Sequence, residues 1–133
     1  HRAAQKRQRI EMKLDLQDVR LVVDPMLIRE AMENYVTNAL KYTPVGGVIT
    51  VRSYIDDKRF FFIVEDTGIG IRPEDLNNLF EPYFRPDREE TREIEGIGIG
   101  LSLVKRIVDR HDGEVWAENR PGGGSRFGFW LPC

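Results

Sequence analysis

Residues 24–44 of this 133-residue chain, DPMLIREAMENYVTNALKYTP, contain the pattern from which its fold can be predicted. Asp24 followed by Pro25 is a typical helix start, because an Asp side chain caps free backbone N–H groups and proline fits the first helical position. Apolar residues then recur at helical spacing, namely Ile28, Ala31, Met32, Tyr35 and Ala39. The pattern predicts a helix over residues 25–42 that buries one stripe against the rest of the chain.

Segments of alternating or short apolar character on both sides of this helix predict strands. They cover residues 10–16, 21–23, 48–55, 60–66, 114–119 and 125–131, and further helices are expected at 72–80 and 101–111. The tight connections at 56–58 and 121–124 favour hairpins. We therefore expect a two-layer α/β sandwich, with a mixed, mainly antiparallel five-stranded sheet and about three helices on one face.

Composition and charge limit the class of protein. Hydrophobic residues make up 41% and charged residues 32%, which is ordinary for a soluble globular domain, and the net charge of −2 gives no general nucleic-acid footprint. Cys133 is the only cysteine, so no disulfide can form within the chain and a reducing compartment fits. No apolar run approaches the roughly 18 residues of a membrane span.

The first nine residues form a basic stretch that differs in character from the remainder. We interpret residues 1–9 as a linker or chain end, and the alternative is a basic arm that binds nucleic acid or lipid. Residues 10–133 are then expected to form a single domain, since that length suffices to bury a core.

The predicted helix over residues 25–42 carries a second, polar stripe. Its members share one face and are Glu30, Asn34, Asn38, Lys41 and Tyr42. Two Asn residues one turn apart are unusual, because Asn is a poor helix former. An Asn carbonyl oxygen suits Mg²⁺, and a neighbouring Lys can neutralise phosphate charge. From spacing alone, a phosphate or metal site and a solvated polar flank are equally supported.

Two glycine-containing segments adjoin regular elements. Asp66 ends a predicted strand, and Gly68 and Gly70 follow it, so the carboxylate could accept a hydrogen bond from a ligand that approaches the backbone closely. The alternative is a strand-to-turn Asp with two turn glycines. Residues 96–101, GIGIGL, precede a predicted helix, where backbone N–H groups can bind an anion. The alternative there is a flexible hinge.

Five segments together resemble the sequence boxes of sensor histidine kinases. Residues 34–44 are similar to their asparagine box, 66–71 to the first glycine box, 79–85 to the phenylalanine box, 96–101 to the second glycine box, and 124–127 with 131–132 to the last. All five occur in the family's order and together span about residues 10–132. The resemblance implies a Bergerat-type ATP-binding fold, in a superfamily that includes DNA gyrase B, heat-shock chaperone ATPases and mismatch-repair ATPases.

The resemblance also implies a role for each matching position. Asn38 and Asn34 would hold Mg²⁺ on the phosphates of ATP, Lys41 and Arg85 would contact phosphate, and Asp66 would accept the adenine amino group. Residues 86–95 would form a lid over the nucleotide. The positions implied to bind nucleotide are Asn34, Asn38, Lys41, Tyr42, Asp66, Gly68, Gly70, Ile71, Tyr83, Arg85, Gly96, Gly98, Gly100, Leu101 and Ser125.

One position distinguishes a kinase from an ATPase. The gyrase-like ATPases carry, four residues before the magnesium-binding Asn, a Glu that activates water, and here that position is Asn34, which cannot act as a base. Glu30 lies one turn earlier, about 6 Å further along the helix axis. We therefore expect slow hydrolysis. The phosphoryl group would go to a histidine on a separate dimerisation domain of the parent kinase, which serves a response regulator.

The resemblance also implies a cytoplasmic location, with no nucleic-acid or membrane contact by this domain. Two alternatives remain open. One is a conformational ATPase of the same superfamily, and the other is a degenerate module that binds partners without nucleotide. The second draws support from bulky Ile97 and Ile99 in the second glycine box and from the acidic residues of the expected lid.

Overall fold

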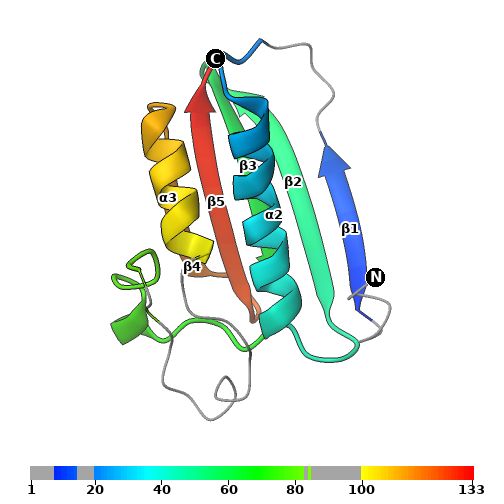
Figure 1. Cartoon of the computed structure of the whole chain (residues 1–133). Coiled ribbons are helices and arrows are strands. Elements are labelled where there is room, and N and C mark those ends of the chain that lie inside the picture. Colours follow the sequence, from blue (N-terminus) through cyan, green and yellow to red (C-terminus); the bar gives the residue numbers. More distant parts are fainter. Residues whose placement is uncertain (1–7, 15–19, 83, 85–99) are drawn as a thin grey trace.

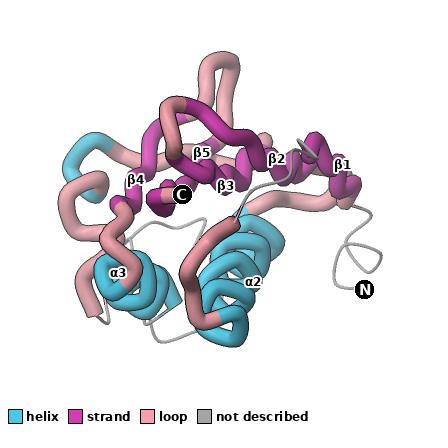
Figure 2. The backbone as a smooth tube through the Cα atoms, turned by 90° about the horizontal axis from the view of Figure 1, so that it is seen from above, coloured by secondary structure: helices cyan, strands magenta, loops and turns pink. Residues whose placement is uncertain are grey.

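The computed structural model describes residues 8–14, 20–82, 84 and 100–133. These residues form two layers, in which helices α2 (Pro25–Tyr42) and α3 (Gly100–Arg110) lie side by side on one face of a five-stranded sheet (Figures 1 and 2). The predicted two-layer α/β sandwich is therefore confirmed. Among the described residues, no helix is both long enough and apolar enough to span a membrane.

The sheet is mixed and mainly antiparallel, as predicted. Its strands are β1 (Arg9–Leu14), β2 (Val48–Asp56), β3 (Arg59–Asp66), β4 (Glu114–Asn119) and β5 (Ser125–Pro132), in the order β1-β2-β3-β5-β4. Only the β1–β2 pair is parallel. Strand β3 thus lies at the centre, and the polar side chains near its C-terminal end are surrounded by other elements.

The core lies between the helices and the sheet. Tyr35 of α2 is fully buried, and its ring centroid lies 5.9 Å from that of Phe127 and 5.8 Å from that of Phe129. Its hydroxyl donates a hydrogen bond of 2.7 Å to the carbonyl oxygen of Gly128. Of the predicted apolar stripe, Met32 is only partly buried, whereas the other four members are buried. Packing of this stripe therefore fixes α2 across β5 and β3.

Side-chain hydrogen bonds join the two helices at one end of the helical layer. The Asp24 carboxylate accepts from the backbone N–H groups of Met26 and Leu27 at 3.0 and 3.3 Å, which confirms the predicted N-cap. The N–H of Asp24 itself donates to Nε2 of His111 at 3.0 Å. Because Nε2 accepts, Nδ1 carries the proton and donates to the Ile107 carbonyl at 2.7 Å. The end of α3 is thereby joined to the start of α2.

Three sequence predictions differ from the structure. Residues 21–23 form no strand, because their backbone pairs with no strand among the described residues, and Val22 is fully exposed. Residues 72–80 form the short 3₁₀ helix η1 (Pro73–Asp75) followed by turns, since their backbone bonds join residues three apart, as from Asn78 to Asp75. Gln8 is buried and β1 begins at Arg9, so the folded part extends at least to residue 8.

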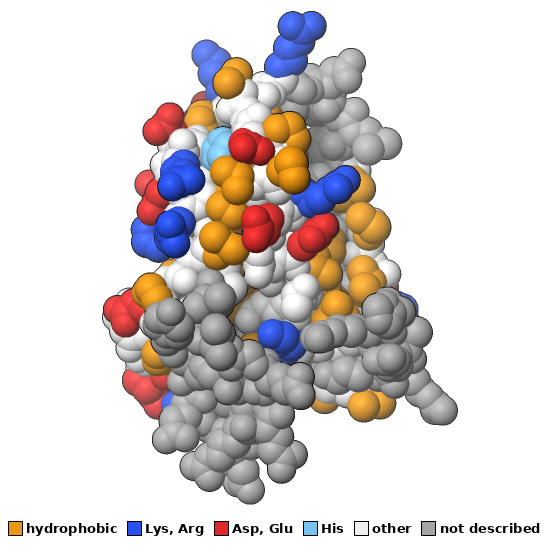
Figure 3. Space-filling model, viewed as in Figure 1, with side chains coloured by type: hydrophobic (Ala, Val, Ile, Leu, Met, Phe, Trp, Pro, Cys, Tyr) orange, Lys and Arg blue, Asp and Glu red, His pale blue; other side chains and the backbone are white. Residues whose placement is uncertain are grey.

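The outer surface of the helical layer carries charges of both signs. Figure 3 shows acidic and basic side chains interspersed around a band of hydrophobic ones along the helices. The described part of this face therefore presents no broad field of one sign that would attract a strongly charged partner.

Replacement of the buried tyrosine tests the packing of α2. Tyr35→Phe removes the hydroxyl that bonds the Gly128 carbonyl, and the free energy of unfolding is expected to fall by about 1 kcal/mol. Urea denaturation measures the change. Tyr54→Phe is the control, because Tyr54 is 38% exposed, and it should leave stability nearly unchanged. Equal losses in the two variants would contradict the assigned packing.

Candidate functional site

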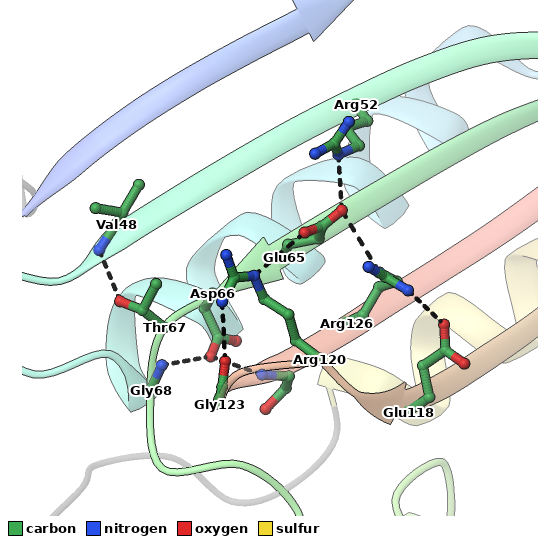
Figure 4. A network of polar contacts seen from close by, with 11 residues as sticks. Val48, Arg52, Glu65, Asp66, Thr67, Gly68, Glu118, Arg120, Gly123 and Arg126 are labelled. Carbon is green, nitrogen blue, oxygen red and sulfur yellow. Dashed lines mark hydrogen bonds and ion pairs between the residues drawn. The ribbon is translucent and has the colours of Figure 1, made fainter.

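The candidate site is built around the carboxylate of Asp66, at the C-terminal end of β3. This residue is 2% exposed, and its Oδ1 accepts hydrogen bonds from the backbone N–H groups of Gly68 at 2.8 Å and Ser125 at 3.2 Å (Figure 4). Its Oδ2 accepts no hydrogen bond from any residue that the structure describes. Asp66 therefore combines a buried carboxylate with one acceptor oxygen still available.

Burial decides the ionisation of this carboxylate. Desolvation raises the pKa of Asp66, while the two backbone hydrogen bonds and the positive charge of Arg120 act in the opposite direction and only partly offset it. A buried carboxylate with an unused oxygen is costly in an otherwise packed protein. Such an arrangement favours a ligand that donates a hydrogen bond.

Three glycines allow the surrounding loops to approach Asp66. A Cβ at Gly68 would lie 2.6 Å from the Tyr42 carbonyl oxygen, at the end of α2, and a Cβ at Gly124 would overlap the Asp66 carbonyl. Gly70 has a φ of 77°, which L side chains rarely adopt. The first glycine segment, the β4–β5 turn and the last turn of α2 therefore converge at one end of β3.

Asn119 also shapes the site, although nothing in the sequence indicated it. Its Oδ1 accepts from the backbone N–H of Ile71 at 2.7 Å, and its Nδ2 donates to the Ile71 carbonyl at 2.9 Å. The Asn119 amide thus pairs with the backbone of Ile71 as a neighbouring strand would, and it holds the loop that follows Asp66 against the end of β4. An Asn at a strand end is common in turns, so its residue type alone did not reveal this contact.

The polar stripe of α2 borders the second glycine segment. The Asn34 amide nitrogen donates to the Glu30 carbonyl at 2.8 Å, and a Cβ at Gly100 would lie 3.0 Å from the Asn34 oxygen. Asn38 is partly buried, and its side chain bonds no other described residue. Lys41 and Tyr42 are partly buried in the last turn of α2. The start of α3 therefore lies against the face that carries both asparagines.

The remaining predicted site residues divide into two sets. Leu101 and Ile71 pack against the hydrophobic core, and Ser125 lies beside Asp66 through its backbone N–H. Tyr83, Arg85, Gly96, Gly98 and the expected lid at 86–95 lie outside the described residues. The structure thus brings together Asp66, Gly68, Ser125 and the end of α2.

The two asparagines on the polar stripe of α2 offer amide oxygens to a metal. Within residues 8–14, 20–82, 84 and 100–133, no group of three or more His, Cys, Asp or Glu residues could hold a metal ion. Asn34 and Asn38 offer neutral oxygen ligands, which suit Mg²⁺ when phosphate oxygens complete its coordination. The described residues therefore fit a magnesium ion carried by a phosphorylated ligand.

Comparison with known proteins shows the family. A sequence model described as histidine kinase-, DNA gyrase B- and HSP90-like ATPase matches residues 23–133. The chain belongs to this ATPase family. The resemblance that the sequence boxes indicated is thereby confirmed, and the domain is of the sensor histidine kinase type, since its relatives carry that name.

The relatives of this ATPase domain are longer proteins. The adaptive-response sensory kinase SasA of Trichormus variabilis is 40% identical over 129 residues, covering 96% of this chain and 31% of SasA. The sensor histidine kinase CusS of Escherichia coli K12 is 44% identical over 110 residues, covering 83% of this chain and 23% of CusS. The chain therefore spans less than a third of the length of these curated relatives.

Solved structures of histidine kinases share the fold of this ATPase domain. The catalytic domain of histidine kinase ThkA, in a nucleotide-free form, has a TM-score of 0.84 at 28% identity, covering 98% of this chain and 83% of that one. Full-length ShkA in complex with AMPPNP also has a TM-score of 0.84 at 28% identity, covering 98% of this chain and 27% of ShkA. These similarities support the strand order and the helical layer described above.

A stability measurement tests the cost of the buried carboxylate. Asp66→Asn keeps an oxygen that can accept from Gly68 and Ser125 but removes the charge. Because the folded-state pKa of Asp66 is raised, wild type loses stability as pH rises above the ordinary carboxyl value of about 4. We expect the variant to unfold at higher urea than wild type at pH 7, and the difference to shrink as the pH falls towards 4.

The control is Asp109→Asn, which removes only an exposed ion pair with Lys105 of 2.8 Å on α3. It is expected to bring no gain in stability at pH 7. If Asp66→Asn were less stable than wild type at pH 7, the carboxylate would be structural, and its burial would not indicate a ligand.

Proposed function

We propose that the chain binds ATP with Mg²⁺ and donates the γ-phosphoryl group to a histidine on a separate dimerisation domain of a longer sensor kinase. The observation that carries the proposal is the buried Asp66 carboxylate, which has one unused oxygen among glycines that permit close approach. The family supports nucleotide binding, because its members are ATPase domains.

At the base-binding end, Asp66 would accept the exocyclic amino group of adenine through Oδ2. Its Oδ1 is already held by Gly68 and Ser125, so the carboxylate is fixed before the ligand arrives. Such pre-organisation lowers the entropic cost of binding. Gly70 and Ile71 belong to the loop that Asn119 fastens, and they would border the base.

At the phosphate end, α2 would supply Asn38 and Lys41, with Asn34 one turn before Asn38. Mg²⁺ would bridge and neutralise phosphate oxygens when it is bound. Gly100 begins α3 beside Asn34, and backbone N–H groups at a helix N-terminus favour negative charge. Arg85, the glycines at 96 and 98, and the expected lid would complete this end.

The chemistry proposed is transfer to a protein histidine, with little hydrolysis. Asn34 occupies the position where the superfamily's hydrolysing members use Glu, and its amide is already bonded to the Glu30 carbonyl. No group at that position can take a proton from water. A conformational ATPase is the alternative, and sustained turnover of ATP by the isolated chain would favour it.

The partners follow from the same proposal. The acceptor histidine would belong to a dimerisation and phosphotransfer domain of the parent chain, and the next acceptor would be a response regulator. A solved structure of ThkA in complex with the response regulator TrrA, with a TM-score of 0.80 and 27% identity to this chain, supports this type of partner. Phosphorylation of a separately added phosphotransfer domain of the parent kinase, in the presence of labelled ATP, tests this part directly.

Calorimetric titration with ATP tests binding and turnover together. We expect a saturable isotherm in the presence of Mg²⁺ that returns to baseline, because hydrolysis is slow. Asn38→Ala removes a proposed magnesium ligand and should weaken binding by about tenfold, or ~1.4 kcal/mol, while binding without Mg²⁺ changes little.

Asn77→Ala is the matched control, since Asn77 lies in the turns after η1 and lines a hollow with Lys105 and Asp109 of α3, where no phosphate contact is proposed. It should bind as wild type does. Heat that continues after each injection would indicate that the chain hydrolyses ATP, and would favour a conformational ATPase over a kinase. Absence of binding in wild type, with or without Mg²⁺, would contradict the proposal and favour an interaction module.

A further inference from the structure

The face of the sheet opposite the helices carries a charged network directly behind the candidate site. Successive residues of a strand point to opposite faces, so Glu65 lies on the open face while Asp66 faces the helical side. Glu65 is only 6% exposed, although no helix among the described residues covers this face. Its burial comes from arginines that surround it (Figure 4).

Three guanidinium groups converge on this one carboxylate. The Nε atom of Arg52 lies 2.7 Å from Oε1 of Glu65, that of Arg126 lies 3.4 Å from the same oxygen, and that of Arg120 lies 3.4 Å from Oε2. Arg126 is also bonded to Glu118 at 3.1 Å. A buried carboxylate needs such partners, because an unpaired charge would be strongly destabilising.

Arg120 differs from the other two arginines in its location. Arg52 and Arg126 lie within strands, whereas Arg120 begins the connection between β4 and β5. Its Nη1 donates to the Gly123 carbonyl at 3.1 Å, its backbone N–H donates to the Gly124 carbonyl at 2.9 Å, and the Gly123 N–H donates to its carbonyl at 3.1 Å. The turn at residues 120–124 is therefore folded onto Arg120 and anchored by it to β3.

This turn is the part of the chain that reaches Asp66 from the β5 side. Gly124 lies so close to the Asp66 carbonyl that a Cβ there would overlap it, and the next N–H, that of Ser125, donates to Asp66 Oδ1. The charge of Arg120 also acts on Asp66 and favours the ionised carboxylate. One side chain thus affects both the position and the charge of the proposed base-binding acceptor, from the opposite face of the sheet.

We propose that Arg120, anchored by Glu65, is a positioning residue that sets selectivity for nucleotides whose base carries an amino group. It holds the 120–124 turn so that the Ser125 N–H fixes Oδ1 of Asp66 and leaves Oδ2 directed at the base. Arg120 itself does not touch the nucleotide. This inference rests on the proposed role of Asp66 as the acceptor for adenine.

The test compares ATP with purine riboside triphosphate, which has the same ring system without the amino group. Affinities for both are measured with Mg²⁺ for wild type, Arg120→Gln, Arg120→Lys and Arg126→Gln. Wild type should prefer ATP by roughly tenfold, the range expected for one hydrogen bond to a charged group. Arg120→Gln should weaken ATP binding by roughly fivefold and leave the analogue within about twofold, because only ATP donates to Asp66.

Two variants separate positioning from general stability. Arg120→Lys keeps the charge beside Asp66 and should restore part of the preference for ATP. Arg126→Gln removes another cation from the same Glu65 carboxylate without releasing the turn, so it should keep the wild-type preference. The chemical shift of the Ser125 amide proton reports on the turn in each folded variant, and it should move further in Arg120→Gln than in Arg126→Gln, although residue 126 is its neighbour in the chain.

The outcomes distinguish this inference from the function on which it rests. Equal weakening of both nucleotides by Arg120→Gln, or an unchanged preference for ATP, would overturn the role of Arg120 while leaving the role of Asp66 intact. A wild-type domain that binds ATP and the analogue equally would overturn the adenine contact itself, and the inference with it. If Arg126→Gln also lost the preference for ATP over the analogue, selectivity would depend on all the arginines around Glu65 and not on Arg120 in particular.

Discussion

The hydrogen bonds that hold Oδ1 of Asp66 are the interaction on which the rest of the site depends. The Asp66 carboxylate, at the end of the central strand, is almost completely buried. Two backbone N–H groups and the guanidinium of Arg120 partly offset the free-energy cost of burying its charge. One of these N–H groups belongs to the loop that follows β3, and the other belongs to the first residue of β5. Their convergence requires glycine at several positions, since a side chain at residue 68 or 124 would meet backbone atoms.

The two faces of the sheet carry different groups of residues. On the helical face, the buried stripe of α2 packs against β5 and β3 and places the polar stripe with Asn34 and Asn38 towards the start of α3. On the open face, Glu65 gathers arginines from β2, β5 and the β4–β5 turn. Because β3 contributes both Glu65 and Asp66, a single strand connects the charged network on one face with the proposed base-binding group on the other.

Much of the fold could be predicted from sequence because its signals are local. The cap at Asp24 and the apolar stripe predicted the helix over residues 25–42, and alternating apolar residues predicted the strands of both hairpins. The strand expected at 21–23 was wrong, because an apolar run of three residues does not ensure a ladder partner. The α-helix expected at residues 72–80 was wrong, because this segment forms a 3₁₀ helix and turns. The side-chain hydrogen bond from Arg72 to Asp75 and the proline at 73 suit a 3₁₀ helix, which is tighter than an α-helix.

The candidate site was less predictable, because its decisive contacts join distant parts of the chain. Sequence boxes indicated Asp66, the glycines and both asparagines. They did not indicate that Asn119 would pair with the backbone of Ile71 or that Arg120 would reach Glu65, since sequence separations of 48 and 55 residues leave no local pattern. Such contacts depend on strand order, which brings β5 between β3 and β4.

A crystal structure of the chain with a non-hydrolysable ATP analogue and Mg²⁺ tests the central claim most directly. We expect the amino nitrogen of adenine to lie about 3 Å from Oδ2 of Asp66, with Oδ1 still bonded to Gly68 and Ser125. The phosphates are expected to lie along Asn38 and Lys41. An adenine ring bound away from Asp66, or a carboxylate that rotates and gives up its backbone donors to receive the base, would contradict it.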